Sequence, residues 1–133
     1  MPNTRQTEEF GEKVYDLEER LIDFAVRIIR MIEDLPNTRV GNHIAGQLLR
    51  CGTSPAPNYG EAQGAESRAD FIHKMRVCLK ELRETRVWLL MIVRATLIKS
   101  SSKLDPLIQE TNELISIFVT SIRTAKKGKK RHQ

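Results

Sequence analysis

Apolar residues recur along most of the chain at alternating intervals of three and four positions, the spacing of helices that pack nearly parallel to one another. The first stripe predicts a helix that ends at Leu35, because the residue before Pro36 is disfavoured in helical geometry. Asn37 or Thr38 can cap the next helix through a side-chain oxygen. The stripe of the first helix comprises Phe10, Val14, Leu17, Leu21, Phe24, Ile28, Met31 and Leu35, widened by Ala25, Ile29 and Ile32.

A second helix begins near Arg39 and meets two prolines. Pro55 and Pro57 each remove a backbone hydrogen bond and clash with the preceding turn, at about 3 kcal/mol or more within a helix. The helix therefore either breaks into two or continues with a kink, and the prolines alone do not decide between them. Asn58, Ala62 and Ala65 resume the apolar face beyond the prolines. The expected core residues before them are Val40, Ile44, Leu48 and Cys51.

Two further helices complete the pattern. Ser67 is a candidate N-cap with Asp70 three residues later, and Asp105 with Pro106 marks the start of the last helix. Residues 99–103 form a short polar loop between them. These elements predict an all-α, up-down-up-down antiparallel four-helix bundle. The third stripe comprises Phe71, Met75, Cys78, Leu82, Thr85, Leu89, Ile92 and Thr96, flanked by Ile72, Leu79 and Val93. The fourth comprises Leu107, Thr111, Leu114 and Phe118, beside Ile108, Ile115 and Ile122.

The chain has 133 residues, enough for one domain with a single core, which we expect in residues 1–125. Residues 126–133 are expected to form a disordered basic tail, because this run has nothing apolar to bury. The five bases of the tail account for the whole formal charge of +5, since the other seventeen Lys and Arg residues equal the seventeen Asp and Glu residues.

Charge is also uneven within the bundle. Residues 1–35 hold nine acids and five bases, whereas residues 68–94 hold seven bases and three acids. The first and third helices of such a bundle lie on opposite corners, so these charges cannot easily neutralise each other within one subunit. Between subunits they can, and a head-to-tail contact of that kind closes into a ring when the rotation permits. The pattern therefore predicts a homo-oligomer.

Polar residues and glycines replace leucines from Gln47-Leu48-Leu49-Arg50 through the segment 53–62. Together with Asp70-Phe71-Ile72-His73-Lys74 and Glu81-Leu82-Arg83-Glu84-Thr85, this stretch resembles the bacterial four-helix-bundle proteins of 23S ribosomal RNA intervening sequences. The resemblance covers nearly the whole chain. It implies one long second helix, kinked near Pro55 and Pro57, and a homopentameric barrel.

The polar motif residues share helix faces. Arg50, Ser54, Asn58 and Glu61 recur at intervals of four, four and three. A buried carboxylate needs a partner, so we expect a hydrogen-bonded seam between the second and third helices, with Arg50 or Arg83 neutralising a glutamate. Such a seam either fixes the register of the helices, the interpretation we favour, or lines a ligand or RNA pocket. The polar seam is the set Gln47, Arg50, Ser54, Asn58, Glu61, Glu81 and Glu84.

No motif indicates a reaction, and the chain is expected to be non-catalytic. Di-iron bundles need a Glu-x-x-His on each of two helices, and the nearest pattern here is Asp70-x-x-His73. His43 and His132 are isolated, so we expect no metal and no other cofactor. Ser54 lacks the glycine-flanked elbow of a hydrolase nucleophile.

Several other residues are expected to have structural roles only. Cys51 and Cys78 lie on apolar faces and are expected to be free, buried thiols. Tyr59 and Trp88 are expected to anchor the core or an interface. A cytoplasmic location is expected, because there is no N-terminal signal pattern and no apolar run of membrane-spanning length.

Nucleic acid is the favoured partner, and RNA above all, given the ribosomal RNA context of the family that the chain resembles. One basic tail offers about five phosphate contacts, and several tails on one ring would add avidity. The alternative is a pentameric protein scaffold similar to the accessory protein of diversity-generating retroelements, which engages a reverse transcriptase; the tail would then only aid solubility. The expected nucleic-acid contacts are Lys126, Lys127, Lys129, Lys130, Arg131, Arg76, Lys80 and Arg83.

Overall fold

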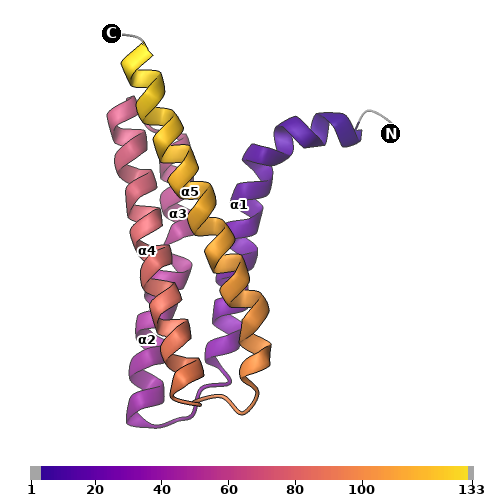
Figure 1. The fold of residues 1–133 in the computed structure, drawn as a ribbon, viewed down its shortest axis with the longest axis vertical. Coiled ribbons are helices and arrows are strands. Elements are labelled where there is room, and N and C mark those ends of the chain that lie inside the picture. The colour runs from indigo at the N-terminus through magenta and orange to yellow at the C-terminus, as the bar shows by residue number, and fades with distance from the viewer. Residues whose placement is uncertain (1–3, 132–133) are drawn as a thin grey trace.

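The computed structural model describes the backbone of residues 4–131 and the side chains of residues 17–128. Within this part of the chain all regular structure is helical, and α1, the pair α2 and α3, α4 and α5 run alternately up and down (Figure 1). The predicted up-down-up-down four-helix bundle is confirmed. The elements are α1 (Thr4–Ile32), α2 (Arg39–Thr53), α3 (Pro55–Gln63), α4 (Arg68–Arg94), the 3-10 turn η1 (Ser101–Leu104) and α5 (Asp105–Arg131).

The second helix of the bundle continues through its prolines with a kink, as predicted. α2 and α3 follow one another with a bend of 19° at residue 54. The backbone N–H of Ser54 still donates to the Arg50 carbonyl, and that of Asn58 donates to the Ser54 carbonyl, each at 3.2 Å. The bend therefore lies where Pro55 and Pro57 have no backbone N–H to donate to the preceding turn. The neighbouring backbone hydrogen bonds keep the two segments in one continuous helix.

The helices are arranged so that α1 and α4 occupy opposite corners. α1 packs against α2 and α3, and α4 packs against α2, α3 and α5. α1 meets α5 over only a short stretch, and no Cα atom of the described part of α1 lies within 8 Å of one in α4. The described part of α1 and the basic α4 are thus diagonal to one another within one subunit.

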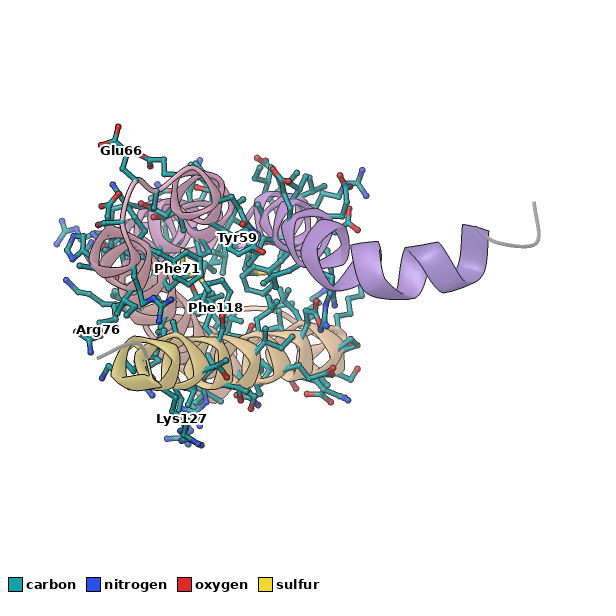
Figure 2. The ribbon with its side chains drawn as sticks, turned by 90° about the horizontal axis from the view of Figure 1, so that it is seen from above. Tyr59, Glu66, Phe71, Arg76, Phe118 and Lys127 are labelled. Atoms are coloured by element: carbon teal, nitrogen blue, oxygen red, sulfur yellow. The ribbon has the colours of Figure 1, made fainter. Side chains whose placement is uncertain are left out.

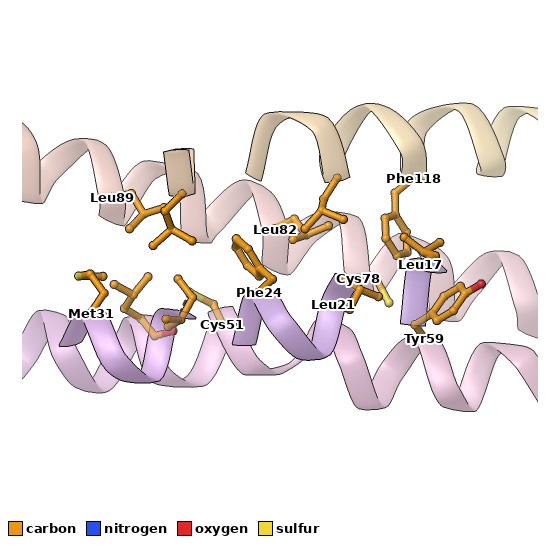
Figure 3. Packing of buried hydrophobic residues seen from close by; sticks show 14 of the residues in the cluster. Leu17, Leu21, Phe24, Met31, Cys51, Tyr59, Cys78, Leu82, Leu89 and Phe118 are labelled. Atoms are coloured by element: carbon orange, nitrogen blue, oxygen red, sulfur yellow. Dashed lines mark hydrogen bonds between the residues drawn. The ribbon is translucent and has the colours of Figure 1, made fainter. Parts of the chain in front are cut away.

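The core consists largely of the predicted stripes (Figure 3). Thr85 and Thr111 are fully buried among the apolar side chains, and their hydroxyls donate to the carbonyls of Glu81 and Leu107 at 2.8 and 2.7 Å. Each hydroxyl is therefore satisfied by its own helix. Phe10 and Val14 lie outside the described side chains. The predicted residues found buried include Leu17, Leu21, Phe24, Ile28, Met31, Leu35, Ile44, Leu48, Cys51, Met75, Cys78, Leu82, Leu89, Ile92, Leu107, Leu114 and Phe118.

Some expected core positions are wrong. Val40 is 55% exposed, because Gly41 takes the buried place in the first turn of α2, where a side chain would collide with the backbone of Pro36. Thr96 is exposed, since α4 ends at Arg94 and Thr96 adopts a left-handed φ of 53° just beyond the C-cap. Phe71 is only partly buried and Ile29 is exposed.

The observed starts of the helices agree with the sequence predictions more closely than the observed C-terminal ends do. Thr38 caps α2 by accepting from the Gly41 N–H, and Ser67 caps α4 by accepting from the Asp70 N–H, each at 3.1 Å. The polar loop before α5 contains the turn η1, whose Leu104 is buried. Residues 126–131, which the sequence places in the tail, continue α5. Lysine and arginine are good helix formers and interact favourably with the C-terminal end of a helix dipole.

Candidate nucleic-acid interface and polar seam

A groove between α4 and α5 collects several of the cations that the sequence singled out. Arg76 and Arg83 reach it from α4, and Lys126 reaches it from α5, together with Arg123. The volume of the groove is about 310 Å³, and none of its lining residues is a carboxylate. All four cations are exposed. We call this feature the α4–α5 basic groove; its apolar lining is Leu79, Val119 and Ile122.

Other predicted nucleic-acid residues lie near this groove. Lys80 is exposed on α4, one turn from Arg76. Arg76 and Lys127 point away from the bundle interior, where Tyr59 and Phe118 lie (Figure 2). The side chains of Lys129, Lys130 and Arg131 are outside the described set.

The start of α4 is joined to the last turns of α5. Arg68 Nη1 donates to the Ala125 carbonyl at 3.5 Å, and a Cβ at Gly128 would lie 2.6 Å from that nitrogen. The Arg68 guanidinium therefore lies against α5 at Gly128, a position without a side chain. The contact links the start of α4 to the last turns of α5.

The polar seam is brought together in part. Arg50 Nη1 donates to Glu81 at 3.1 Å, while Nη2 donates to Glu84 and, at 3.3 Å, to Gln47. The indole N–H of Trp88 donates to the same Glu84 oxygen at 3.1 Å. Desolvation lowers the pKa of the Arg50 guanidinium, but the Glu84 and Glu81 carboxylates raise it, and the net shift is upward. The cluster therefore keeps its charges paired and ties α2 to α4.

The rest of the seam has other partners. The Asn58 side-chain amide donates to the carbonyl and to the hydroxyl oxygen of Ser54, both at 2.9 Å, and so supports the bend within its own helix. Glu61 lies 3.5 Å from the ammonium of Lys74 and is paired there rather than with an arginine. Arg83, the other expected partner of the glutamates, lines the α4–α5 basic groove instead.

The single aromatics act as packing residues. Tyr59 is buried, with its ring edge-on to Phe118 at a centroid distance of 6.0 Å. Burial raises the pKa of the Tyr59 hydroxyl, which accepts a hydrogen bond from Gln63. Trp88 is partly buried and meets the exposed His43 edge-on at 5.9 Å.

The two thiols are buried and free. Burial raises the pKa of the Cys78 thiol to about 12, and it also raises the pKa of Cys51. Cys78 Sγ donates to the Pro55 carbonyl at 3.5 Å, beside the bend. These are the properties of unreactive core thiols.

Sequence reasoning missed two features. Arg20 of α1 forms a two-pronged pair with Glu110 of α5, Nε–Oε2 at 3.1 Å and Nη2–Oε1 at 2.6 Å, and Glu113 lies 3.5 Å away. Arg123 was missed because the fourth helix was examined only for its apolar stripe. A count of charges at the positions flanking that stripe would have found Arg123 and Glu110, but not the pairing of Glu110 with Arg20.

Among the residues that the structure describes, no group of three or more His, Cys, Asp and Glu side chains is placed to hold a metal ion. No helix within residues 4–131 is both long and apolar enough to cross a membrane.

The fold and the motif residues define a small four-helix bundle with a bent second helix and a paired polar cluster between its second and third helices. A family model described as "23S rRNA-intervening sequence protein" matches residues 12–120, so the chain belongs to the 23S rRNA-intervening sequence protein family. A crystal structure of a protein with unknown function from the S23 ribosomal protein family of Bacteroides thetaiotaomicron VPI-5482 is 33% identical, with a TM-score of 0.74. The match covers 80% of this chain and 97% of that one. No curated protein matches the chain.

Proposed function

We propose that this protein is a non-catalytic, oligomeric RNA-binding protein that holds the sugar-phosphate backbone in the α4–α5 basic groove. The groove is the observation that carries the proposal. It brings Arg76, Arg83, Arg123 and Lys126 together from two helices, and its described lining includes no acid to compete with a phosphate. Salt-dependent attraction of this kind supplies most sequence-tolerant binding to nucleic acids.

The arrangement of the positive charges along α4 favours RNA over a protein partner. Arg76 and Arg83 are seven residues apart on α4, or about 10 Å along the helix axis, so they address successive points of an extended polyanion. The bases at the end of α5 lie beyond Lys126, so the groove and the tail form one continuous basic surface in this proposal. Arginine planes also stack on unpaired bases, and the apolar lining offers them a surface.

The proposed assembly is a homopentamer held by α1 of one subunit and α4 of the next. Ile22 and Ile29 are exposed two turns apart on the acidic α1, at 42 and 43%. Val87 and Met91 are exposed one turn apart on the basic α4, both at 46%. Exposed apolar residues inside complementary charge favour a specific contact over non-specific aggregation. A ring would multiply the weak RNA contacts of each groove.

The test is fluorescence anisotropy with a labelled single-stranded RNA 12-mer at 50 and 200 mM KCl, on protein whose mass has been fixed by light scattering. We expect binding that weakens steeply with salt. The double variant Arg76→Gln/Arg83→Gln should bind at least tenfold more weakly and lower the slope against log salt by about 1.4, two contacts at roughly 0.7 each. Truncation after Ala125 should weaken binding as well, because it removes Lys126 and the rest of the basic end.

The matched control is Lys99→Gln/Lys103→Gln, which removes two exposed charges from the loop at the opposite end of α5. Its affinity should stay within about twofold of the wild type. If the groove variant and the control weaken binding equally, the groove is not the site. If an intact oligomer binds no RNA, the result would favour the alternative function, a protein scaffold similar to the accessory protein that engages a reverse transcriptase.

A further inference from the structure

A pocket of about 740 Å³ lies between α1, α3, α4 and α5, and all four helices contribute side chains to its lining. Its volume is within the range of about 300–1,000 Å³ that is typical of small-molecule sites. The N-terminal part of α1 bends away from the bundle (Figures 1 and 2), so it leaves the pocket accessible from that end. None of the residues of the α4–α5 basic groove or of the polar seam lines this pocket.

The apolar part of the lining is recessed, and the part that faces solvent is polar. Tyr59 and Phe71 lie between the helices (Figure 2). The exposed lining residues are Gln63, Ser116 and Thr120, none of which is apolar. Apolar material therefore has to enter the pocket before it meets apolar surface. The buried or half-buried apolar lining residues are Leu17, Tyr59, Phe71, Met75 and Ile117.

This arrangement suits a small molecule better than a protein partner. A surface that binds another protein presents large apolar side chains to solvent. The large apolar side chains that the described surface does expose are elsewhere, and none of them lines this pocket. They are Ile22, Ile29, Val40, Leu49, Val87 and Met91.

The polar groups of the lining favour a neutral ligand. The one charged side chain among the described lining residues is Arg20, and its guanidinium is paired with Glu110. The Tyr59 hydroxyl accepts a hydrogen bond from Gln63. No buried side-chain nitrogen or oxygen of the described residues lacks a hydrogen bond. A charged ligand would therefore lose its hydration without gaining an unpaired opposite charge in return.

The rim on α5 offers hydrogen bonds to one polar group of such a ligand. Ser116 and Thr120 are one helical turn apart, and both line the pocket. Their hydroxyls can each donate or accept a hydrogen bond. On the opposite side, the flexible thioether of Met75 can adapt to the shape of an aromatic ring and makes favourable contacts with it.

We propose that this pocket binds a neutral, mainly apolar small molecule. Its aromatic body packs against Tyr59, Phe71 and Met75, and a single hydrogen-bonding group reaches the hydroxyls of Ser116 and Thr120. The proposal rests on the recessed apolar lining and is independent of RNA binding, because the pocket and the α4–α5 basic groove share no residue.

The test uses the full chain and Nile red, a neutral aromatic dye with a carbonyl oxygen, whose fluorescence rises when it leaves water. We expect saturable binding of one dye molecule per chain. Ser121 is a half-buried lining residue, so Ser121→Phe should fill part of the pocket and weaken binding about tenfold. The matched control is Gln109→Phe, because Gln109 is exposed on the same helix and does not line the pocket. Its affinity should stay within about twofold of the wild type.

A second measurement locates the dye without any substitution. The chain has four methionines, and nuclear magnetic resonance of protein labelled with ¹³C at the methionine methyl groups reports on each of them. The rings of the bound dye should shift the methyl signal of Met75. The signals of Met31, which is buried and does not line the pocket, and of Met91, which is exposed on α4, should stay in place.

Three outcomes would overturn the proposal. A shift of Met91 without one of Met75 would place the dye on the exposed apolar surface of α4. Fluorescence that rises without saturating would show that the dye only partitions onto the protein. Equal affinities of the Ser121→Phe and Gln109→Phe variants, both folded by circular dichroism, would mean that this pocket is not the site.

Discussion

Gly52 is where the backbone of α2 lies directly against Ile28 of α1. A Cβ built on Gly52 would lie 2.8 Å from Cγ2 and 2.9 Å from Cγ1 of Ile28, which is itself fully buried. Overpacking a core costs about 1–3 kcal/mol, whereas alanine gains about 1 kcal/mol over glycine inside a helix. We expect Gly52→Ala to lower the free energy of unfolding by about 1 kcal/mol in urea denaturation.

Gly46 provides the control within the same helix. A Cβ at Gly46 would meet nothing within 4 Å, and the residue is exposed. Gly46→Ala should therefore raise the free energy of unfolding by up to about 1 kcal/mol. If Gly52→Ala proved as stabilising as Gly46→Ala, the close approach of α1 and α2 would not constrain the bundle.

The buried thiol of Cys78 makes stability depend on alkaline pH. Its pKa is about 12 in the folded protein, against about 8.5 in an unfolded chain. Between these values the unfolded state loses the proton and the folded state keeps it, so the free energy of unfolding falls as pH rises. The fall is up to about 1.4 kcal/mol per pH unit for this group, starting near pH 8.5.

The measurement is urea denaturation at pH 7.5, 9.0 and 10.0, with Cys78→Ala as the comparison. The variant is expected to be less stable at pH 7.5 but to lose less stability on going to pH 10.0. Parallel pH profiles for the two proteins would contradict a buried, neutral thiol at this position.

At the residue scale, the periodic pattern predicted most of the core because spacing reports which face of a helix is buried. The prediction of burial was wrong for Val40 and Thr96, since both lie at helix ends, where the path of the loop decides which residues are buried. The bond between Arg50 and its two glutamates was predicted as one of several pairings. Glu61 could not be assigned to Lys74, because helix rotation beyond the bend was unknown.

At the element scale, the pair of Arg20 and Glu110 is a polar link between α1 and α5, which meet over a short stretch in the described structure. Both side chains are partly buried, and the two-pronged geometry is the strong form of this interaction. A double-mutant cycle with Arg20→Ala and Glu110→Ala should give a coupling energy of about 1 kcal/mol in thermal unfolding.

The exposed pair of Arg86 and Asn112 between α4 and α5 is the matched control for this cycle. Its coupling should be at most a few tenths of a kcal/mol, because both groups are well solvated. Equal coupling in the two cycles would mean that partial burial adds nothing to the α1–α5 link.

The bent helix was partly predictable. Two prolines, followed by a return of the apolar face, predicted either a break or a kink in the second helix. The family resemblance favoured the kink. The physical reason is visible only in three dimensions: Asn58 donates to Ser54 within the bend, and the Pro55 carbonyl accepts from Cys78. The turn η1 had no sequence signal beyond Leu104, a single apolar residue in a polar stretch.

At the scale of the whole molecule, assembly can be tested through the exposed apolar residues of α4. Met91→Glu would place a carboxylate where the proposed neighbour presents its acidic α1, so repulsion should weaken association at least tenfold. Sedimentation velocity at micromolar protein checks this, with Leu49→Glu as a control of similar exposure on α2. A wild-type protein that sediments as a monomer would contradict the assembly, and equal effects of the two variants would contradict the chosen face.

The basic groove shows where sequence reasoning stopped. Arg76, Arg83 and Lys126 were all named from the sequence, but as separate parts of a helix and a tail. Only the antiparallel packing of α4 and α5 brings them beside Arg123. Contacts between residues some fifty positions apart depend on how each helix is rotated about its axis. The apolar spacing does not determine which exposed side chains of two helices then meet.

The separation of α1 from α4 has a kinetic consequence. In the proposed assembly, the net negative charge of residues 1–35 and the net positive charge of residues 68–94 would give each subunit an electric dipole. In that assembly an approaching copy would feel a torque before any side chains touch, which would turn its acidic first helix toward a basic α4 and raise the fraction of productive collisions. Orientation is therefore decided at long range, and salt should slow the encounter before it loosens the completed contact.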